Sequence, residues 1–282
     1  MAGTLDREAA LAAVLARVRT LEAEAVATAT AAGRVLSEDA RAAVDLPPFP
    51  SSAMDGFAVR AADVPGTLPV VFRIAAGRPA ETPLGLGEAM GIATGGLVPE
   101  GADAVMPIEV VDDHDNAVVI SESTRVGAHV RPRGGDVAAG DIVVPAGTRL
   151  GPAQVGALAA AGVAELRCGR RPRVALLTTG TELRAPGEAL GPGQIYESNG
   201  AMLAAALGAV GAEVERLAPV QDDSDAHRAA LERALEADVV VSSGGVSVGP
   251  HDLGPHRGER GREHGAVRLV DLPRAERLAR RA

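Results

Sequence analysis

Apolar residues near the amino terminus recur at three- and four-residue spacing, the pattern of one face of an amphipathic helix. The residues on that face are Leu11, Val14, Leu15, Val18 and Leu21. Asp6 precedes them and is expected to cap this helix. A second, shorter helix is predicted around residues 27–37, before the three prolines of the stretch DLPPFP end regular structure.

Between about residues 68 and 144 the pattern changes to brief β-prone runs. PVVFRIAAG, AVMPIEVV, AVVISES and DIVVPAG alternate with turns rich in Gly, Pro and Asp. This arrangement predicts a compact antiparallel β domain. The stretch GPAQVGALAAAGV, residues 151–163, returns to a helical pattern.

From Arg173 onward, strands and helices alternate. A buried strand, RVALLTTGTEL, precedes the helix SNGAMLAAALGAVGA, for which Ser198 or Asn199 is the expected N-cap. The strand EVERLAPV, the helix DSDAHRAALERALEA and the strand DVVVSSGGVSVG follow. Alternation of this kind goes with right-handed crossovers and predicts a parallel sheet with helices on both faces.

Composition narrows the range of functions. The chain has 282 residues, enough for two or more domains, and aromatic side chains make up only 1% of it. With so few aromatic platforms and a net charge of −9, we do not expect nucleic-acid binding. The single cysteine, Cys168, excludes an internal disulfide and fits a reducing compartment. The sequence has no signal-peptide pattern and no apolar run long enough to cross a membrane, so we expect a cytoplasmic protein.

Three loops leave the carboxyl ends of the predicted parallel strands, at residues 178–182, 221–223 and 242–252. Ligands of open parallel sheets bind outside these ends, so the loops are expected to line one crevice. In the third loop Gly244 and Gly245 have no Cβ atoms, which lets backbone N–H groups approach an anion. Each loop alone is also compatible with an ordinary turn, whereas their shared edge favours a binding site.

Acidic residues gather at the same edge of this sheet. Glu182, Asp222 and Asp252 each follow one of the predicted strands. Carboxylates are compatible with a bound phosphate when a hard cation lies between them, and Mg²⁺ binds through a few carboxylates together with phosphate and water. The sequence therefore predicts a Mg²⁺ site at this edge.

Three polar turns lie in or beside the predicted β domain. PFPSSAMDGFAVRAADVPG, residues 48–66, contains Asp55, which is read either as a surface-turn residue or as part of an anion or metal site. The turn ATGG offers the hydroxyl of Thr94, with a plain hairpin loop as the alternative. The turn RPRGGDVAAGD places two arginines, which suit phosphate, near Asp136, with a solvated turn as the alternative.

Seven stretches occur in the order seen in one protein family. They are DLPPFPSSAMDGFAVRAAD, IATGGLVPEGADAVMPIE, RPRGGDVAAGD, LLTTGTEL, YESNGAML, VQDDSDAHRAAL and VVSSGGVSVGPHD. Together they resemble the molybdopterin molybdenumtransferases, the bacterial relatives of the gephyrin E domain. Any one stretch is ordinary, but seven in the same order are specific to that family.

The resemblance implies an activity and partners. Members of this family insert molybdate into adenylylated molybdopterin in a Mg²⁺-dependent step, giving molybdenum cofactor and AMP. The resemblance further implies a homodimer with the active cleft between subunits, and a molybdopterin adenylyltransferase as a partner protein. The alternative is a noncatalytic molybdopterin-binding or scaffold protein, or an inactive truncated product.

The resemblance also assigns site residues by motif. The expected catalytic residues are Asp55, Thr94, Asp136 and Glu182. The expected substrate-binding residues are Thr179, Gly180, Asp222, Ser243, Gly244, Gly245, Ser247 and Gly249. The expected Mg²⁺ ligands are Glu182, Asp222 and Asp252. The Mg²⁺ ligands are also predicted by their positions at the edge of the parallel sheet. The assignments of Asp55, Thr94 and Asp136 depend on the resemblance alone.

Pattern and resemblance together predict a multidomain fold of the α/β plus β class. An elongated helical linking domain is expected at residues 1–45 and 140–170, and a small β-rich domain at residues 46–139. An incomplete three-layer α/β/α domain with a mostly parallel sheet is expected at residues 171–253. Residues 254–282 are an atypical Arg-rich tail. Because family members continue with the rest of the α/β domain at this point, we expect the tail to be an out-of-frame translation, with a divergent natural terminus as the alternative.

Overall fold

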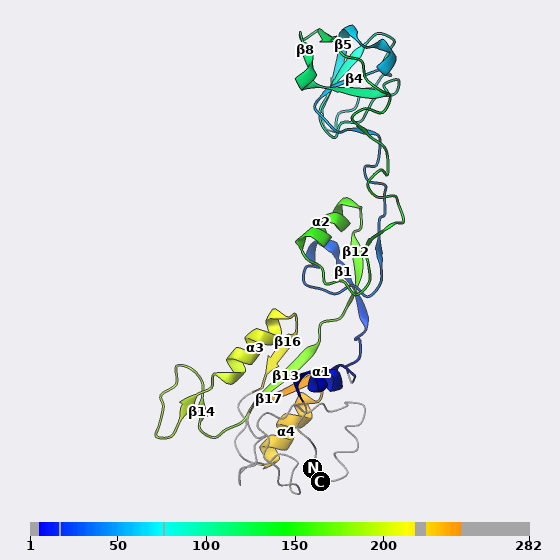
Figure 1. Cartoon of the computed structure of the whole chain (residues 1–282). Helices are drawn as coiled ribbons and strands as arrows, with labels where there is room; N and C mark the ends of the chain where they lie inside the picture. Colours follow the sequence, from blue (N-terminus) through cyan, green and yellow to red (C-terminus); the bar gives the residue numbers. More distant parts are fainter. Residues whose placement is uncertain (1–5, 17, 76, 218–223, 244–282) are drawn as a thin grey trace. The chain divides into compact units, whose positions relative to one another are not determined.

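The chain forms two compact units, which are described separately below. The computed structural model describes residues 6–16, 18–75, 77–217 and 224–243 (Figure 1). One unit is Ala25–Arg167, and the other combines Met1–Glu24 with Cys168–Ala282. The further division of the first unit into a linking part and a β-rich part stays a prediction.

A six-stranded sheet dominates the unit Ala25–Arg167, in the order β7-β4-β6-β5-β9-β8. Its strands are β4 (Gly56–Val59), β5 (Gly66–Ile74), β6 (Ala89–Ile92), β7 (Ala104–Pro107), β8 (Val111–Asp113) and β9 (Ala117–Ile120). Neighbours are antiparallel, as predicted, except that β5 and β6 run parallel. Two 3₁₀ turns, η2 (Ala61–Asp63) and η3 (Ile108–Val110), follow β4 and β7.

Both faces of strand β4 are covered by apolar side chains. Phe57 and Val59 belong to one core cluster, while Ala58 between them belongs to a second cluster with Met90 and Val105. Successive side chains of a strand point to opposite faces of the sheet, so a strand covered on both sides shows no alternation of polar and apolar residues. This explains why the sheet begins at β4, earlier than the residue 68 expected from the pattern.

Three two-stranded pairs join the segments that precede and follow the six-stranded sheet in the sequence. They are β1 (Ala23–Ala27) with β12 (Glu165–Gly169), β2 (Ala40–Arg41) with β11 (Ile142–Val144), and β3 (Ser51–Ser52) with β10 (Val130–Arg131). The predicted helix at residues 151–163 is confirmed as α2 (Pro152–Ala160).

The predicted helix at residues 27–37 is wrong. The segment instead contains the end of β1, the 3₁₀ turn η1 (Thr28–Thr30) and extended backbone. The hydroxyl of buried Thr28 donates to the carbonyl of Val163 at 2.6 Å, and the backbone of Leu36 donates to Thr148 at 3.0 Å. Pairing with these distant residues outweighs the helix propensity of the alanines, which is high among amino acids but small in energy compared with tertiary contacts.

Helix α1 (Arg7–Leu15) begins where the sequence predicts. The Asp6 side chain accepts a hydrogen bond from the backbone N–H of Ala9 at 2.7 Å, which confirms the N-cap. The helix ends before Val18, so the predicted apolar face is shorter than its pattern suggested. Leu11 and Leu15 are more than half exposed, and no residue of α1 is buried.

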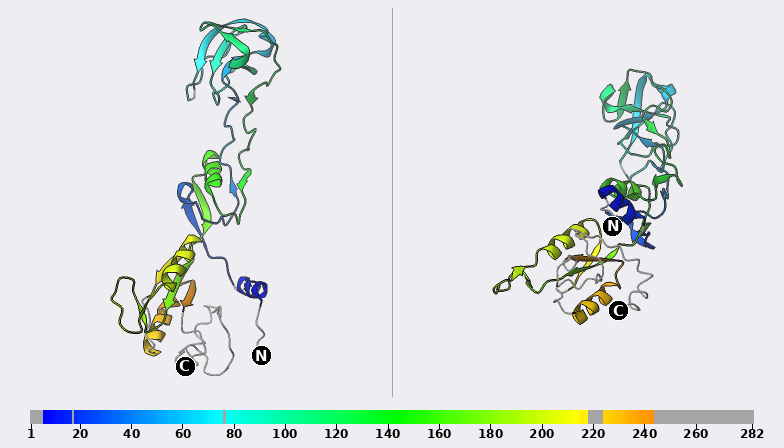
Figure 2. Two further views of the ribbon diagram at one scale, coloured as in Figure 1. Left: turned by 60° about the vertical axis from the view of Figure 1, so that its left-hand side comes forward. Right: turned by 60° about the horizontal axis from the view of Figure 1, so that its bottom comes forward.

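The second unit contains a three-stranded parallel sheet in the order β16-β13-β17. Its strands are β13 (Arg173–Thr178), β16 (Glu213–Arg216) and β17 (Val239–Ser243), with helices α3 (Asn199–Ala209) and α4 (Ser224–Ala234) between them. From the central strand β13 the chain passes through α3 to β16 at one edge of the sheet. It then passes through α4 to β17 at the other edge. Right-handed crossovers therefore place α3 and α4 on opposite faces, as predicted (Figure 2).

The core of this sheet follows the same alternation of faces. Ala175 and Leu177 pack with Ala234 of α4, whereas the side chain of Leu176 between them is buried on the other face. A separate parallel pair, β14 (Leu183–Arg184) with β15 (Ile195–Tyr196), lies between β13 and α3 in the sequence. None of the helices in the described ranges has the length and hydropathy needed to cross a membrane.

Candidate functional site

Backbone pairing gathers three of the motifs found in the sequence. Strand β3 pairs with β10, so the SAMDG segment runs beside the segment that leads into RPRGGD. On its other side the backbone of Ser52 donates to Gly96 at 3.0 Å and accepts from Gly95 at 2.8 Å, in the ATGG turn. The segments that bear Asp55, Thr94 and Arg131 are therefore neighbours within the unit Ala25–Arg167.

Two predicted site residues, Asp55 and Thr94, are in direct contact. The backbone N–H of Thr94 donates to Oδ1 of Asp55 at 2.6 Å, and the Thr94 hydroxyl donates to the same oxygen at 2.9 Å. These two bonds, the backbone one first, hold the pKa of the exposed Asp55 carboxyl below its ordinary value. Within the described part of the chain, Oδ2 of Asp55 has no hydrogen-bond or ion-pair partner, so it is available to a ligand.

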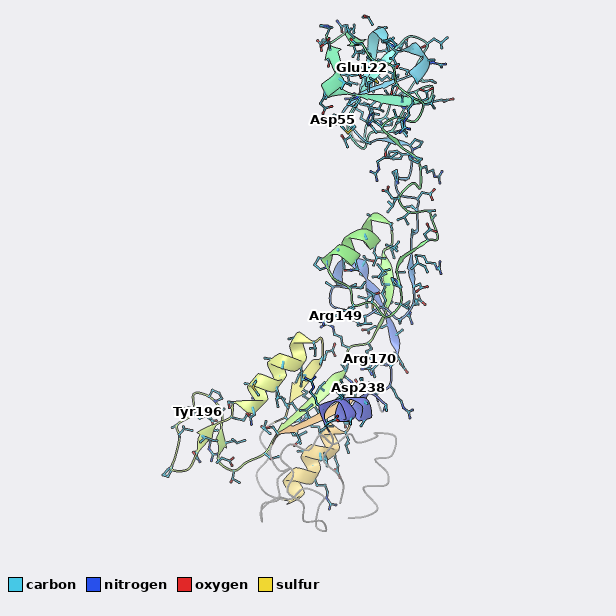
Figure 3. All side chains as sticks on the ribbon, viewed as in Figure 1. Asp55, Glu122, Arg149, Arg170, Tyr196 and Asp238 are labelled. Atoms are coloured by element: carbon cyan, nitrogen blue, oxygen red, sulfur yellow. The ribbon has the colours of Figure 1, made fainter. Side chains whose placement is uncertain are left out.

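Gly56, next to Asp55, allows the chain to pass close to strand β7 as it enters β4. A Cβ atom at this position would lie 2.0 Å from the carbonyl oxygen of Met106 on strand β7. The backbone N–H of Ile108 donates to the carbonyl of Asp55 at 3.0 Å, which fixes the loop from the same side. Asp55 therefore lies where a turn leads into β4, a strand that is buried along its whole length (Figure 3).

The third predicted residue of this unit, Asp136, forms an ion pair with Arg131. The other arginine of the turn, Arg133, donates to Asp45 at 2.6 Å, and the backbone N–H of Ala139 donates to the same carboxylate at 2.8 Å. The bond from Ala139, followed by that from Arg133, lowers the pKa of Asp45. Both arginines thus lie against carboxylates of the chain, and no bond joins Asp136 to Asp55 or Thr94 in the described ranges.

In the other unit, the carboxyl ends of β13 and β17 meet as the sequence predicts. The backbone N–H of Thr179 donates to the carbonyl of Ser243 at 3.1 Å. The side-chain amide of Asn199, in the first turn of α3, donates to the hydroxyl of Ser243 at 3.2 Å. Asn199 was predicted only as a candidate N-cap, and its bond to a site residue was missed because it joins elements 44 residues apart.

Gly180 and Glu182 form the turn that follows β13. Gly180 has a φ of +153°, and a Cβ atom there would lie 2.6 Å from the Glu182 carboxylate. The backbone conformation therefore favours glycine, whereas the exposed Glu182 side chain could turn away from a Cβ atom. The Glu182 carboxylate is exposed and has no partner among the described residues, as suits a ligand for a cation.

Glu197 is a buried acid that sequence reasoning missed. Its side chain accepts from the backbone N–H of Gly200 at 2.5 Å and from Nη2 of Arg216 at 2.7 Å, and it is only 3% exposed. It therefore stabilises the amino end of α3 and ties it to β16. The one feature of the sequence that could have indicated this role is the position of Glu197 directly before the predicted helix.

The remaining predicted site residues lie outside the described residues. They are Asp222, Gly244, Gly245, Ser247, Gly249 and Asp252. In the ranges that are described, no group of three or more His, Cys, Asp or Glu side chains is placed to hold a metal ion. Asp55, Thr94 and Asp136 belong to one compact unit, and Thr179, Gly180, Glu182 and Ser243 to the other.

Comparison with known families identifies the lineage. The family model described as the MoeA N-terminal region (domain I and II) matches residues 5–162, more than half of the chain. The chain belongs to the MoeA family. A second model, described as a probable molybdopterin binding domain, matches residues 175–267 of this MoeA-family chain.

Individual MoeA relatives agree with this assignment. Molybdopterin molybdenumtransferase 2 of Mycobacterium tuberculosis is 45% identical over 231 residues, covering 79% of this chain and 57% of that protein. The molybdopterin molybdenumtransferase of Haemophilus influenzae is 37% identical over 227 residues, covering 79% and 56%. A crystal structure of the molybdopterin biosynthesis MoeA protein of Pyrococcus horikoshii aligns with a TM-score of 0.77 and 30% identity, covering 86% and 67%. The chain spans little more than half the length of these curated relatives.

Proposed function

We propose that this chain inserts molybdate into adenylylated molybdopterin in a Mg²⁺-dependent step, giving molybdenum cofactor and AMP. The observation that carries the proposal is the Asp55–Thr94 pair, in which one carboxylate oxygen is fixed and the other is free. Membership of the MoeA family and the match to a molybdopterin-binding model support it. The names of the curated relatives support the reaction class.

In this proposal Asp55 acts as an acceptor and does not bind molybdate directly. A carboxylate with a lowered pKa is ionised near neutral pH, so it repels an anion such as molybdate. Its Oδ2 atom can accept a hydrogen bond from a water or from a proton-bearing group of the substrate. Thr94 holds the carboxylate in place while that contact forms, and Asp136 acts as a further acid of the same unit.

At the carboxyl edge of the parallel sheet, the proposal assigns phosphate binding to the turn after β17. Backbone N–H groups of residues 244–249 would hold the terminal phosphate of the pterin. Ser243 is the last described residue before this segment, and it contacts Thr179 and Asn199. Dithiolene sulfurs of the substrate, and no thiol of the chain, would bind molybdenum, since Cys168 is fully buried.

The residues proposed to hold Mg²⁺ are Glu182, Asp222 and Asp252. The exposed carboxylate of Glu182 fits an oxygen ligand of this hard cation, and the other two acids lie outside the described residues. When bound, Mg²⁺ would offset negative charge on the phosphoanhydride. We extend the proposal to a cytoplasmic homodimer that receives its substrate from a molybdopterin adenylyltransferase.

A second candidate is a noncatalytic molybdopterin-binding protein. The observation that favours it is the match of residues 175–267 to a model described as a probable molybdopterin binding domain, because that description names binding and no reaction. Both candidate functions include binding of adenylylated molybdopterin, and only the first includes its conversion with release of AMP. A binding protein would retain adenylylated molybdopterin without releasing AMP when molybdate and Mg²⁺ are added.

The deciding experiment follows AMP release from adenylylated molybdopterin by the full chain, with molybdate and Mg²⁺ each added or omitted. We expect release that requires both, and a loss of at least tenfold in Asp55→Asn and Glu182→Gln. Asp112→Asn and Glu232→Gln replace exposed acids of the same two units and should match the wild type. Binding without release would select the second candidate, and absence of both would refute the two proposals together.

A further inference from the structure

Ser52 occupies an unusual position for a polar side chain. It is only 1% exposed, although it is two residues from an exposed loop. Most buried hydroxyl groups have hydrogen-bond partners, because an unsatisfied one costs free energy. The hydrogen-bond partners of Ser52 therefore indicate the role of its buried side chain.

The hydroxyl of Ser52 closes the turn that leads to Asp55. Its Oγ atom donates to the carbonyl of Met54 at 2.5 Å and accepts from the backbone N–H of Met54 at 3.3 Å. A serine side chain that bonds two residues ahead restricts a turn that would otherwise have several conformations. The next residue along the chain is Asp55, so the restriction acts directly on the direction of its side chain.

The backbone of Ser52 holds the opposite partner of the same pair. Its N–H donates to Gly96 at 3.0 Å and its carbonyl accepts from Gly95 at 2.8 Å. These two glycines directly follow Thr94, whose N–H and hydroxyl both donate to Asp55. Ser52 thus fixes both the turn that precedes Asp55 and the turn that follows Thr94, the hydrogen-bond donor to Asp55.

We propose that Ser52 is a positioning residue that sets the geometry between Asp55 and Thr94 and, through it, the free Oδ2 atom. Its effect on catalysis rests on the proposed function, whereas its effect on the pair does not. Loss of the Ser52 hydroxyl frees the turn through Met54, and the short contact between Thr94 and Asp55 then lengthens or is lost for part of the time.

Ser51 offers a matched control. It is the adjacent serine, it is 2% exposed, and it lies in the same strand β3. Within the described residues its hydroxyl forms no hydrogen bond, so Ser51→Ala removes the same atom without touching the Asp55 turn. Any effect of merely removing a buried hydroxyl from this strand should appear equally in both variants.

The test compares full-length Ser52→Ala and Ser51→Ala with the wild type by two measurements. Carbon-13 NMR titration of the Asp55 carboxyl, assigned by its absence in Asp55→Asn, reports on the pair without requiring activity. We expect Ser52→Ala to move the Asp55 pKa towards its ordinary value and to lower kcat for molybdate-dependent AMP release at least fivefold. Ser51→Ala should change neither quantity, and a Ser52→Cys variant of similar volume provides the same comparison if Ser52→Ala does not fold.

The two proposals fail in different ways. If Ser52→Ala and Ser51→Ala titrate alike and release AMP at the same rate, Ser52 is a packing residue and the inference is overturned. If the wild type releases no AMP, the proposed function fails, while the NMR titration still decides whether Ser52 positions the pair.

Discussion

Thr94 donates two hydrogen bonds to a single oxygen of Asp55, from its backbone at 2.6 Å and from its hydroxyl at 2.9 Å. The two residues stand 39 positions apart in the sequence. Because both bonds end on Oδ1, the carboxylate is oriented while Oδ2 stays open within the described structure. The Asp55 carboxylate therefore has a fixed orientation, although it lies in a surface turn.

Replacing Thr94 by Val should raise the Asp55 pKa part of the way to its ordinary value. The variant removes the hydroxyl bond but keeps the backbone N–H, which is the larger cause of the lowered pKa. Carbon-13 NMR titration of the Asp55 carboxyl measures the change. Thr67→Val, at an exposed position of β5, is the control and should leave the titration unaltered.

Asp238→Asn should destabilise the parallel-sheet unit by about 2 kcal/mol near pH 7. Arg170 binds this carboxylate through two bonds of 2.8 and 2.9 Å, and the backbone N–H of Arg173 adds a third at 2.7 Å (Figure 3). The Arg170 bonds are the first cause that lowers the Asp238 pKa from 3.8 to about 2. Urea unfolding followed by the fluorescence of Tyr196, the one tyrosine in a chain without tryptophan, measures the loss.

The same ion pair predicts a pH dependence. A group whose pKa is lowered on folding adds stability above its unfolded pKa, and this contribution disappears as the pH falls through the folded value. The difference between wild type and Asp238→Asn should therefore be complete above about pH 4 and shrink towards pH 2. Glu232→Gln, an exposed change on α4, should give no difference at any of these pH values. A constant difference across this range would contradict the assignment.

Gly56→Ala should destabilise the six-stranded sheet by about 1–3 kcal/mol, because the new Cβ would overlap the carbonyl of Met106. Amide exchange of Phe57 and Ala58 in β4 measures the local effect. Gly156→Ala is the opposite case, since this helical glycine has open space around its Cβ position. It should stabilise α2 by up to about 1 kcal/mol, and equal effects of the two substitutions would refute the steric argument.

Glu197→Gln should lower the stability of the parallel-sheet unit by about 1.5–3 kcal/mol, the range for a hydrogen bond to a charged group. The change weakens the bond from Arg216 and the cap on α3. Urea unfolding detects it, again through Tyr196. Glu213→Gln removes an exposed charge from the neighbouring strand β16 and should behave as the wild type.

Several features of this chain could be read from the sequence because they depend on local order. The cap at Asp6, the helix at residues 151–163 and the alternation of strands and helices after Arg173 all follow from periodicity and end signals. Topology rules then place Thr179 beside Ser243, since carboxyl ends of neighbouring parallel strands share one edge. The sequence can thus predict the proximity of residues that two crossovers separate.

Other features were decided by tertiary pairing alone. The alanine-rich segment 27–37 became extended because residues near 148–150 and 163–164 supply its hydrogen bonds. The pairing of β5 with β6 is parallel, which no turn signal announces. Sequence and family resemblance could nominate Asp55 and Thr94, but only the pairing of β3 with β10 and with residues 95–97 shows that Ser52 holds both. Local patterns specify which elements form, whereas long-range backbone hydrogen bonds choose which distant residues meet.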